Sequence, residues 1–338
     1  MTVTQPMLDD RIAMVAACTT IGLPAGARNR DDVLTNQEWN QLAQWLGKHQ
    51  MRPADLLFSD VSDLSSGDLD AQIAFKATAI AERASLVAMA IEQLEQAGIW
   101  TRTRIDEDYP TRWKSRLKGS APPVIFGAGP LELGNRPTIA IVGSREITKE
   151  LGELANSIGS RAASAGFCIV SGGAKGSDRF GMHGSLQADG QAVGVLPAGL
   201  ARMSRERDVR TFIANDQLCL ISQVNPDAGF SVGNAMGRNK LIYALSELTI
   251  VVATAEGSGG TWAGANENLK RGWAPLAVWT GSGAPEGNQA LERNGAYAFS
   301  SLPEDRADFA HLIAEAADRV LAGKQGAPAK QQLSLLGI

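Results

Sequence analysis

The sequence predicts an α/β protein, in which a Rossmann-like, doubly wound and mostly parallel sheet follows an N-terminal helical domain. Two patterns carry this prediction. The first hundred residues show the 3.6-residue periodicity of helices. From residue 138 onward, short apolar runs alternate with helical stretches. Because helical crossovers join consecutive parallel strands, this alternation implies a parallel sheet that helices cover on both faces.

Composition and charge are those of an ordinary folded protein. Of the 338 residues, 44% are hydrophobic and 20% are charged, which excludes wholesale disorder. The longest apolar runs, such as 138–143 and 192–196, have the length of strands and fall short of the roughly 20 residues of a membrane span. Because the net charge is −4, a polyanionic partner requires a local concentration of cations. Residues 202–210, with four Arg against two acids, are one such concentration.

Cysteine usage and the start of the chain favour a cytoplasmic protein. The first residues carry acids where an export signal has basic residues before a long apolar run. Cys18, Cys168 and Cys219 are too scattered for a disulfide framework or a zinc site, and the last two lie in apolar runs typical of buried thiols. We therefore expect a reducing cytoplasm, no membrane association, no metal and no cofactor.

Helical signals dominate residues 1–100, which we interpret as the N-terminal domain. Thr35 and Glu38 form a capping-box pattern at a helix start. The apolar residues that follow recur at helical spacing: Trp39, Leu42, Ala43 and Leu46. A second helix is expected over 69–96. We find no basic hairpin motif for DNA here, so we favour a packing or dimerisation role.

The rest of the chain divides into a connector, a core and a tail. Residues 101–134 are the connector, with one short strand at 124–126, residues 135–322 are the Rossmann-like core, and residues 323–338 are a flexible tail rich in Gly, Ala, Pro and Lys at its start. The core strands are expected at 138–142, 167–170, 192–196, 218–222, 248–253 and 275–279. The core helices are expected up to 165, over 178–188, 204–214 and 237–245, and after 257–261.

Three of the predicted strands end in loops of small residues. In an open parallel sheet, ligands bind outside the carboxyl ends of the strands. Glycines let the backbone approach a ligand, and the following helix offers free N–H groups to an anion. Two of the loops also carry a cation, so we predict a site for a nucleotide or a nucleic-acid backbone. Its residues are Gly143, Ser144 and Arg145; Ser171, Gly172, Gly173 and Lys175; and Ser258, Gly259, Gly260 and Thr261.

The loop sequences match neither of the two common phosphate motifs. No GxxxxGK[ST] occurs, and the first strand ends in GSR where a dinucleotide site has GxGxxG. An ordered series of blocks over roughly residues 100–280 instead resembles the DprA/Smf family of DNA-processing proteins. The blocks are YP at 109–110, PPVIF at 122–126, IAIVGSR at 139–145, VSGGAKGSD at 170–178 with His183, GVLPAGL at 194–200, RNKLIYALS at 238–246 and SGGT at 258–261.

This resemblance implies a core that binds single-stranded DNA, forms a homodimer and loads a RecA-type recombinase. In that family the arginine of GSR and the RN-[RK] helix lie at the DNA pocket, which implies Arg145, Arg238, Asn239 and Lys240 here. Guanidinium and ammonium groups neutralise phosphates, and an Asn amide can bond a base edge or a sugar. The alternative is that Arg238 and Lys240 belong to a solvated helix face and that Asn239 is a cap.

The chain departs from the family pattern near this pocket. Ser222-Gln223 replaces the usual SE, and Arg202-Met203-Ser204-Arg205 stands where the family has YP. The helix after SGGT lacks the usual TA-containing run, and no winged helix is expected after residue 320. These departures leave the fold prediction unchanged.

An enzymatic interpretation of the same loops is the alternative. Nucleotide-cleaving Rossmann proteins of the Lonely Guy type carry GGxGT followed by Glu, and Glu267 follows Thr261 here by six residues rather than three. Asp178 and His183 are weak acid–base candidates, or a helix cap and a packing residue. We favour binding over catalysis. The alternative function is a nucleotide-binding or N-glycoside-cleaving protein of nucleotide sensing, DNA modification or phage defence.

The tail ends in a short motif. Gln332-Leu333-Ser334-Leu335-Leu336 resembles the QL[SD]LF peptide with which bacterial proteins bind the replicative sliding clamp, with Leu336 in place of Phe. Gln332 would hydrogen-bond at the mouth of a pocket, while Leu333, Leu335 and Leu336 fill apolar subsites. The alternative is that these leucines pack on the chain's own core.

Overall fold

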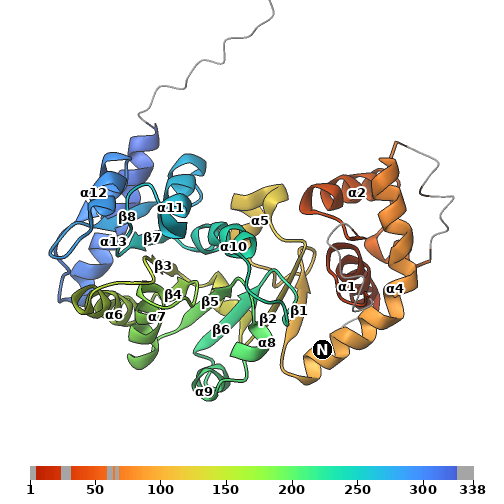
Figure 1. The fold of residues 1–338 in the computed structure, drawn as a ribbon, viewed down its shortest axis with the longest axis horizontal. Coiled ribbons are helices and arrows are strands. Elements are labelled where there is room, and N and C mark those ends of the chain that lie inside the picture. The colour runs from red at the N-terminus through yellow and green to blue at the C-terminus, as the bar shows by residue number, and fades with distance from the viewer. Residues whose placement is uncertain (1–4, 24–31, 59–63, 65–67, 326–338) are drawn as a thin grey trace, which may run out of the picture.

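The structure, a computed structural model, describes residues 5–23, 32–58, 64 and 68–325. A nine-stranded sheet forms its centre, helices cover both faces, and the N-terminal helices lie beside the β1 edge (Figure 1). The predicted fold class is therefore confirmed. None of the helices in these ranges is both long enough and apolar enough to cross a membrane.

Helices and strands alternate along most of the chain. The α-helices are α1 (Gln5–Cys18), α2 (Asn36–Lys48), α4 (Ala71–Gln96), α5 (Thr111–Leu117), α6 (Lys149–Ser164), α7 (Ser177–Gln187), α8 (Leu200–Met203), α9 (Arg207–Ala214), α10 (Val232–Leu245), α11 (Gly259–Arg271), α12 (Glu286–Arg293) and α13 (Arg306–Gln325). The 3-10 helices are η2 (Pro53–Leu57), η3 (Lys118–Ser120) and η4 (Leu131–Asn135). The strands are β1 (Trp100–Thr103), β2 (Val124–Ala128), β3 (Thr138–Val142), β4 (Cys168–Ser171), β5 (Ala192–Leu196), β6 (Leu218–Ser222), β7 (Leu248–Val251), β8 (Leu276–Trp279) and β9 (Tyr297–Phe299).

The strand order creates a switch point in the middle of the sheet. The order is β1-β2-β6-β5-β4-β3-β7-β8-β9. β1 and β2 are antiparallel to each other, β2 is antiparallel to β6, and the remaining neighbours are parallel. The chain moves outward from β3 to β6, then returns through α10 to place β7 on the other side of β3. Ligands of doubly wound sheets bind at such a reversal of direction.

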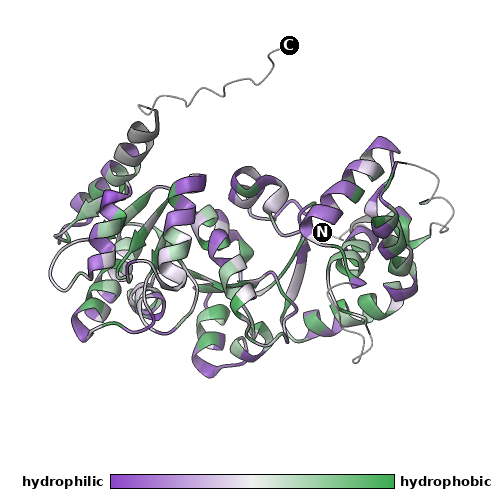
Figure 2. Cartoon of the chain, turned by 45° about the horizontal axis from the view of Figure 1, so that its top comes forward, coloured by the Kyte–Doolittle hydropathy of each residue, from purple (hydrophilic) through white to green (hydrophobic). Residues whose placement is uncertain are grey.

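Alternate strand residues fill two apolar layers, one on each face of the sheet. Ile139 and Ile141 of β3 face the layer that contains α6, α7, α9 and α13, while Ala140 and Val142 face the layer of α5, α10, α11 and α12. Figure 2 shows apolar residues concentrated in the strands and polar residues on the outer sides of the helices. Because both faces are covered, the strands are continuous apolar runs, which is why the sequence reveals them.

The N-terminal helices confirm the predicted cap and join the sheet through a buried ion pair. The Glu38 N–H donates to Thr35 Oγ1 at 3.2 Å, and the Thr35 N–H donates to Glu38 Oε2 at 2.7 Å. The apolar stripe after this cap is buried at Trp39, Leu42 and Leu46. Arg11 of α1 donates to the Asp106 carboxylate at 2.8 Å, and both side chains are buried. This pair links the first helix to the turn after β1.

Several elements differ from their predicted bounds. The predicted connector contributes two strands, because β1 and β2 extend the sheet beyond β6 as an antiparallel edge. The helix expected over 204–214 begins only at Arg207, as α9, and a separate short helix, α8, precedes it at Leu200–Met203. α10 begins at Val232, where the Ser231 hydroxyl caps it by accepting from the Asn234 N–H at 3.1 Å. α1, α12, β9 and α13 were not individually predicted.

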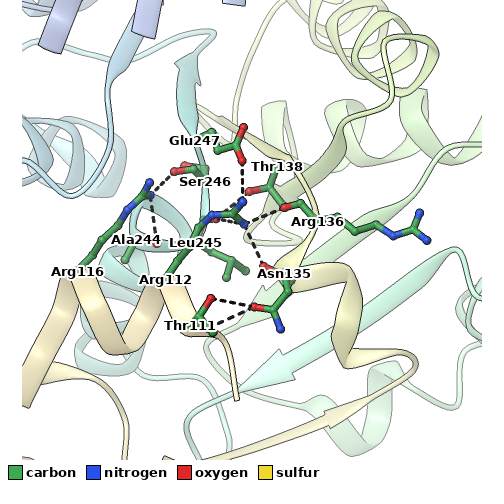
Figure 3. Close-up of polar contacts among 11 residues, drawn as sticks. Thr111, Arg112, Arg116, Asn135, Arg136, Thr138, Ala244, Leu245, Ser246 and Glu247 are labelled. Carbon is green, nitrogen blue, oxygen red and sulfur yellow. Dashed lines mark hydrogen bonds and ion pairs between the residues drawn. The ribbon is translucent and has the colours of Figure 1, made fainter. Parts of the chain in front are cut away.

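The connector also fixes the helix that carries Arg238. Arg116 of α5 donates to the Ala244 carbonyl oxygen at 3.3 Å, and Arg112 donates to Glu247 Oε1 at 2.7 Å (Figure 3). The last carbonyl groups of a helix have no partner within it, so basic side chains stabilise them. α5 therefore anchors the C-terminal end of α10 at the amino edge of the sheet, and the opposite end of α10 reaches the carboxyl edge.

Candidate functional site

The carboxyl ends of β3 and β7 meet at the switch point. Val142 pairs with Val251 in the parallel register. Beyond the strands, the Ser144 N–H donates to the Ala253 carbonyl oxygen at 2.8 Å. These bonds hold the glycine loop after β3 against the segment that follows β7. The small-residue loops predicted after these two strands therefore lie close together.

Two adjoining cavities lie at this carboxyl edge. One of them, which we call the β5 cavity, has a volume of about 540 Å³ and is lined by the loops after β4, β5 and β6. The other, the switch-point cavity, has a volume of about 490 Å³ and is lined by the loops after β3 and β7 and by α10. Both are lined by Arg145, Ala174, Phe230 and Arg238. Volumes of this size accommodate small organic ligands or parts of a polymer.

Arg238 is a buried cation shared by the two cavities. Its relative exposure is 5%, and its Nε has no hydrogen-bond partner within the described ranges. Burial lowers the pKa of Arg238, while the nearby Asp178 carboxylate acts in the opposite direction. A buried charge without hydrogen-bond partners is costly unless a ligand supplies them. The guanidinium is therefore placed to receive an anion.

Asp178 was expected to cap a helix, and that expectation is wrong. Gly176 is the N-cap residue of α7, and Asp178 lies inside the first turn. Its buried carboxylate instead accepts from the Gly172 N–H at 3.1 Å. Burial raises the pKa of Asp178, and this effect exceeds the lowering by Arg238 and by backbone N–H groups. Asp178 thus holds the loop after β4 in place beneath Arg238.

The rim of the cavities carries cations and an exposed aromatic ring. The Arg145 guanidinium carbon lies 5.5 Å from the centre of the Phe230 ring, and Phe230 is 59% exposed. Lys175 and Arg202, both exposed, line the β5 cavity from the loop after β4 and from α8. One acid, Asp227, lines the same cavity. The rim combines charge for phosphates with a flat apolar surface for stacking.

The structure brings together all the predicted phosphate-binding residues except Ser171 and Lys240. Ser171 is fully buried, and its hydroxyl donates to the Ile141 carbonyl oxygen at 2.5 Å. Lys240 lies outside both cavity linings, and its Nζ donates to the Ser120 carbonyl oxygen at 2.9 Å. Asn239 lines the switch-point cavity and donates to the Gly260 carbonyl oxygen at 3.1 Å, so it joins α10 to the start of α11.

The three weak catalytic candidates are not assembled into one site. Asp178 lines the switch-point cavity. His183 is exposed on α7 and does not pack beneath the loop, contrary to one expectation, because it lies on the outer side of that helix. Glu267 is exposed on α11, which covers the opposite face of the sheet from α7. Within the described ranges, no group of three or more His, Cys, Asp or Glu side chains is arranged to hold a metal ion.

Sequence reasoning did not select Phe230, Arg202 or Met236 as site residues. Phe230 is an exposed apolar side chain next to Gly229. Met236 is an exposed apolar side chain on the first turns of α10. In the sequence, Arg202 is marked only by its place in the cationic run 202–210. An aromatic residue next to Gly229, directly before a capped helix, is the signal that would have identified Phe230. The tail residues Gln332, Leu333, Leu335 and Leu336 lie outside the residues that the structure describes.

The family model and the curated relatives agree on one family. The family model for DNA recombination-mediator protein A matches residues 100–309. Protein Smf of Synechocystis sp. is 30% identical over 176 residues, which cover 50% of this chain and 43% of that protein. DNA processing protein DprA of Streptococcus pneumoniae is 28% identical over 210 residues, which cover 61% of this chain and 72% of the relative. The match thus spans less than half of the Synechocystis protein.

Two solved structures share the fold. The crystal structure of DNA processing protein A from Streptococcus pneumoniae superposes with a TM-score of 0.61 and 20% identity, and covers 87% of this chain and 94% of that one. A structure of DNA processing protein A from Helicobacter pylori has a TM-score of 0.52 and 23% identity, and covers 64% of this chain and 96% of that one. For that protein, a single-stranded DNA binding mode is described.

Proposed function

This chain belongs to the DNA recombination-mediator protein A family, and from that premise we propose that it binds single-stranded DNA across its two cavities. We propose further that it loads a RecA-type recombinase onto the bound strand, as one form of the recombination mediation that the family name states. The single-stranded DNA binding described for the Helicobacter pylori protein supports the choice of ligand.

One observation carries the proposal: the buried Arg238 guanidinium is shared by both cavities, and its Nε has no hydrogen-bond partner among the residues that the structure describes. A phosphate oxygen offers the charge and the acceptor atoms that this group lacks. Arg145, Lys175 and Arg202 on the rim add three further cations for neighbouring phosphates. These four cations are spread over the two cavities and their rim, so they can bind several consecutive phosphates of a strand rather than a single phosphate.

The remaining lining residues suit a sugar and a base. The first turn of α11 begins at a glycine loop that lines the switch-point cavity, so the N–H groups of this turn favour an anion there. Phe230 presents more than half of its surface and provides a stacking platform that is tolerant of sequence. Backbone contacts and stacking together favour binding without strong sequence preference.

Three further proposals concern partners and place. We propose that the chain forms a homodimer and that it acts in the cytoplasm. Light scattering of the purified chain measures its mass and would test the homodimer. We also propose that the tail, residues 323–338, binds the sliding clamp through Gln332, Leu333, Leu335 and Leu336. The residues before the motif are rich in Gly, Ala, Pro and Lys, a composition typical of linkers, which would let the peptide reach the clamp while the core holds DNA.

Binding is tested by fluorescence anisotropy with a labelled oligo-dT, for the wild type and for Arg238→Ala. Removing a desolvated charge contact costs about 2 kcal/mol or more, so we expect at least a 30-fold loss of affinity. Arg271→Ala, an exposed arginine at the end of α11, is the matched control and should bind as the wild type does. Equal affinity of all three proteins would refute the proposed site.

The same protein preparation distinguishes the enzymatic alternative. N-glycoside cleavage would release a free base from nucleoside monophosphates, which chromatography detects. We expect no release, because Glu267 of α11 lies on the opposite face of the sheet from Asp178 and His183 of α7, and the exposed His183 lines neither cavity. Base release that depends on Asp178 or Glu267 would favour the alternative.

A further inference from the structure

A cationic surface adjoins the β5 cavity at α8. Arg202 of α8 lines that cavity. Three more arginines, Arg205, Arg207 and Arg210, follow it along the chain, and all three are exposed. We call these three the α8–α9 arginines. They outnumber the two acids among them, Glu206 and Asp208, so the segment adds positive charge directly beside the cavity.

Internal ion pairs do not occupy this charge. Arg202 approaches Glu206 at 3.6 Å, and both side chains are at least half exposed. Exposed pairs of this kind are weak, and a phosphate can replace the carboxylate at little cost. The side chains of the α8–α9 arginines form no hydrogen bond or ion pair with residues that the structure describes. All four guanidinium groups are therefore available to an external anion.

Packing directs two of these arginines outward. Val209, Phe212 and Ile213 of α9 pack against the apolar layer of the sheet. Arg207 and Arg210, three residues apart, occupy the opposite side of the same helix. Both α8 and α9 contact β6 and lie on one flank of the core (Figure 1). Because Arg202 lines the β5 cavity, the arginines that follow it continue from the rim of that cavity along this flank.

We infer that the α8–α9 arginines extend the binding track for single-stranded nucleic acid, so that the strand leaves the β5 cavity past Arg202 and continues along α9. This inference rests on the proposed function. It assigns the backbone of a longer single strand to a surface that lies outside the cavities. Guanidinium groups on a solvated helix face contact phosphates without reading bases, so the added affinity depends on strand length and salt rather than on sequence.

The test compares a short oligo-dT of about 6 nucleotides with a long one of about 20 nucleotides. Arg205→Gln, Arg207→Gln and Arg210→Gln are combined in the full chain, with Arg202 left in place. The salt slope is the steepness with which the logarithm of the binding constant falls as the logarithm of the salt concentration rises. Each lost phosphate contact lowers this slope by about 0.7 for single strands, so the slope for the long strand should fall by about 2. The affinity for the long strand should fall about tenfold at low salt, while the affinity for the short strand should change less than about twofold.

The control removes the same charge elsewhere. The control variant combines Lys270→Gln, Arg271→Gln and Arg306→Gln, which change exposed side chains on α11 and α13. It should leave both affinities at wild-type values. Equal losses for the short and the long strand, or no loss for the long strand, would overturn the extended track. Failure of the wild type to bind either strand would instead refute the proposed function itself.

A gain of affinity separates the inference from damage to the fold. Glu206→Gln with Asp208→Asn removes the two acids and frees Arg202 from its ion pair. Because Arg202 also lines the β5 cavity, this variant should bind both strands more tightly, the long strand several-fold and the short strand by a smaller factor. A misfolded protein cannot produce that result, and an unchanged affinity for the long strand would contradict the track.

Discussion

The guanidinium of Arg238 occupies the space that a side chain at Gly172 would need. A Cβ built on Gly172 would lie 1.6 Å from Arg238 Nη1 and 2.6 Å from Asp178 Oδ2. The glycine after β4 and the arginine of α10 therefore depend on each other, although they lie far apart in the sequence. This close approach explains why glycine stands at the end of that strand, beyond its role in forming a turn.

Gly172→Ala should mimic the loss of Arg238. The added methyl group would displace the guanidinium from the shared wall of the cavities, and we expect a loss of single-stranded DNA affinity of about 30-fold in an anisotropy titration. Gly47→Ala is the matched control, because a Cβ there meets nothing within 4 Å. Wild-type affinity in Gly172→Ala would show that the position of Arg238 does not govern binding.

Arg145→Ala and Lys240→Ala should differ in their salt dependence. Arg145 lines both cavities, so its loss should lower the salt slope by about 0.7, the value for one phosphate on a single strand. Lys240 was expected to do the same, but its ammonium group bonds the Ser120 carbonyl oxygen. We now expect Lys240→Ala to leave the slope unchanged. Titrations between about 50 and 200 mM salt measure both slopes. A fall in the slope for Lys240→Ala would return that residue to the DNA surface.

Asn239→Ala should affect binding more than stability. The amide loses one hydrogen bond, to the Gly260 carbonyl oxygen, at a partly exposed position, which costs about 1 kcal/mol of folding free energy at most. The variant also loses the link between α10 and the loop before α11, so the affinity should fall about tenfold. Thermal melting and a DNA titration on the same preparation measure both effects. A large fall in melting temperature with unchanged affinity would assign Asn239 a purely structural role.

The Arg11–Asp106 pair should make stability depend on pH in the acid range. Burial acts to raise the pKa of Asp106, but hydrogen bonds from Arg11 and Thr103 outweigh it and lower the pKa. The carboxylate therefore stabilises the fold above the unfolded-state pKa of about 3.9, and this stabilisation is lost as the pH falls through the lower folded-state pKa. Asp106→Asn leaves a buried Arg11 without its counter-charge and should cost about 3 kcal/mol near pH 7.

Urea denaturation at several pH values checks this prediction. The difference in unfolding free energy between the wild type and Asp106→Asn should shrink as the medium becomes more acidic than the unfolded-state pKa. Asp68→Asn, which breaks an exposed pair with Lys48, is the control and should leave the unfolding free energy unchanged. A difference that stays constant down to strong acid would contradict the assigned ionisation.

The tail peptide should bind the sliding clamp by itself. A synthetic peptide covering residues 330–338 is expected to bind with an affinity of roughly 1 to 100 μM, as an extended apolar peptide in a preformed groove does. Leu335→Ala with Leu336→Ala should abolish the heat of binding in calorimetry. If the peptide does not bind and deletion of the tail lowers the melting temperature of the protein, the leucines pack on the chain's own core instead.

Local patterns in the sequence determined the architecture. The strands at 138–142, 192–196 and 218–222 have the predicted bounds, because strands covered on both faces are unbroken apolar runs that end at polar or glycine residues. The capping box at Thr35 and Glu38 involves groups three residues apart, so the sequence alone contains it. The glycine loops also indicated the correct edge of the sheet, because all parallel strands end on the same side.

Tertiary structure alone decided which charges are available to a ligand. Arg238 and Lys240 lie two residues apart on one helix, yet Arg238 is buried between the cavities and Lys240 bonds Ser120, which lies far away in the sequence. Periodicity reports which face of a helix is apolar, but not which distant backbone group meets a polar side chain. The antiparallel edge of β1 and β2 and the placement of Arg202 on the cavity wall were hidden for the same reason. The order of the strands decides which distant groups come into contact. Contacts between segments far apart in the chain leave no local pattern in the sequence.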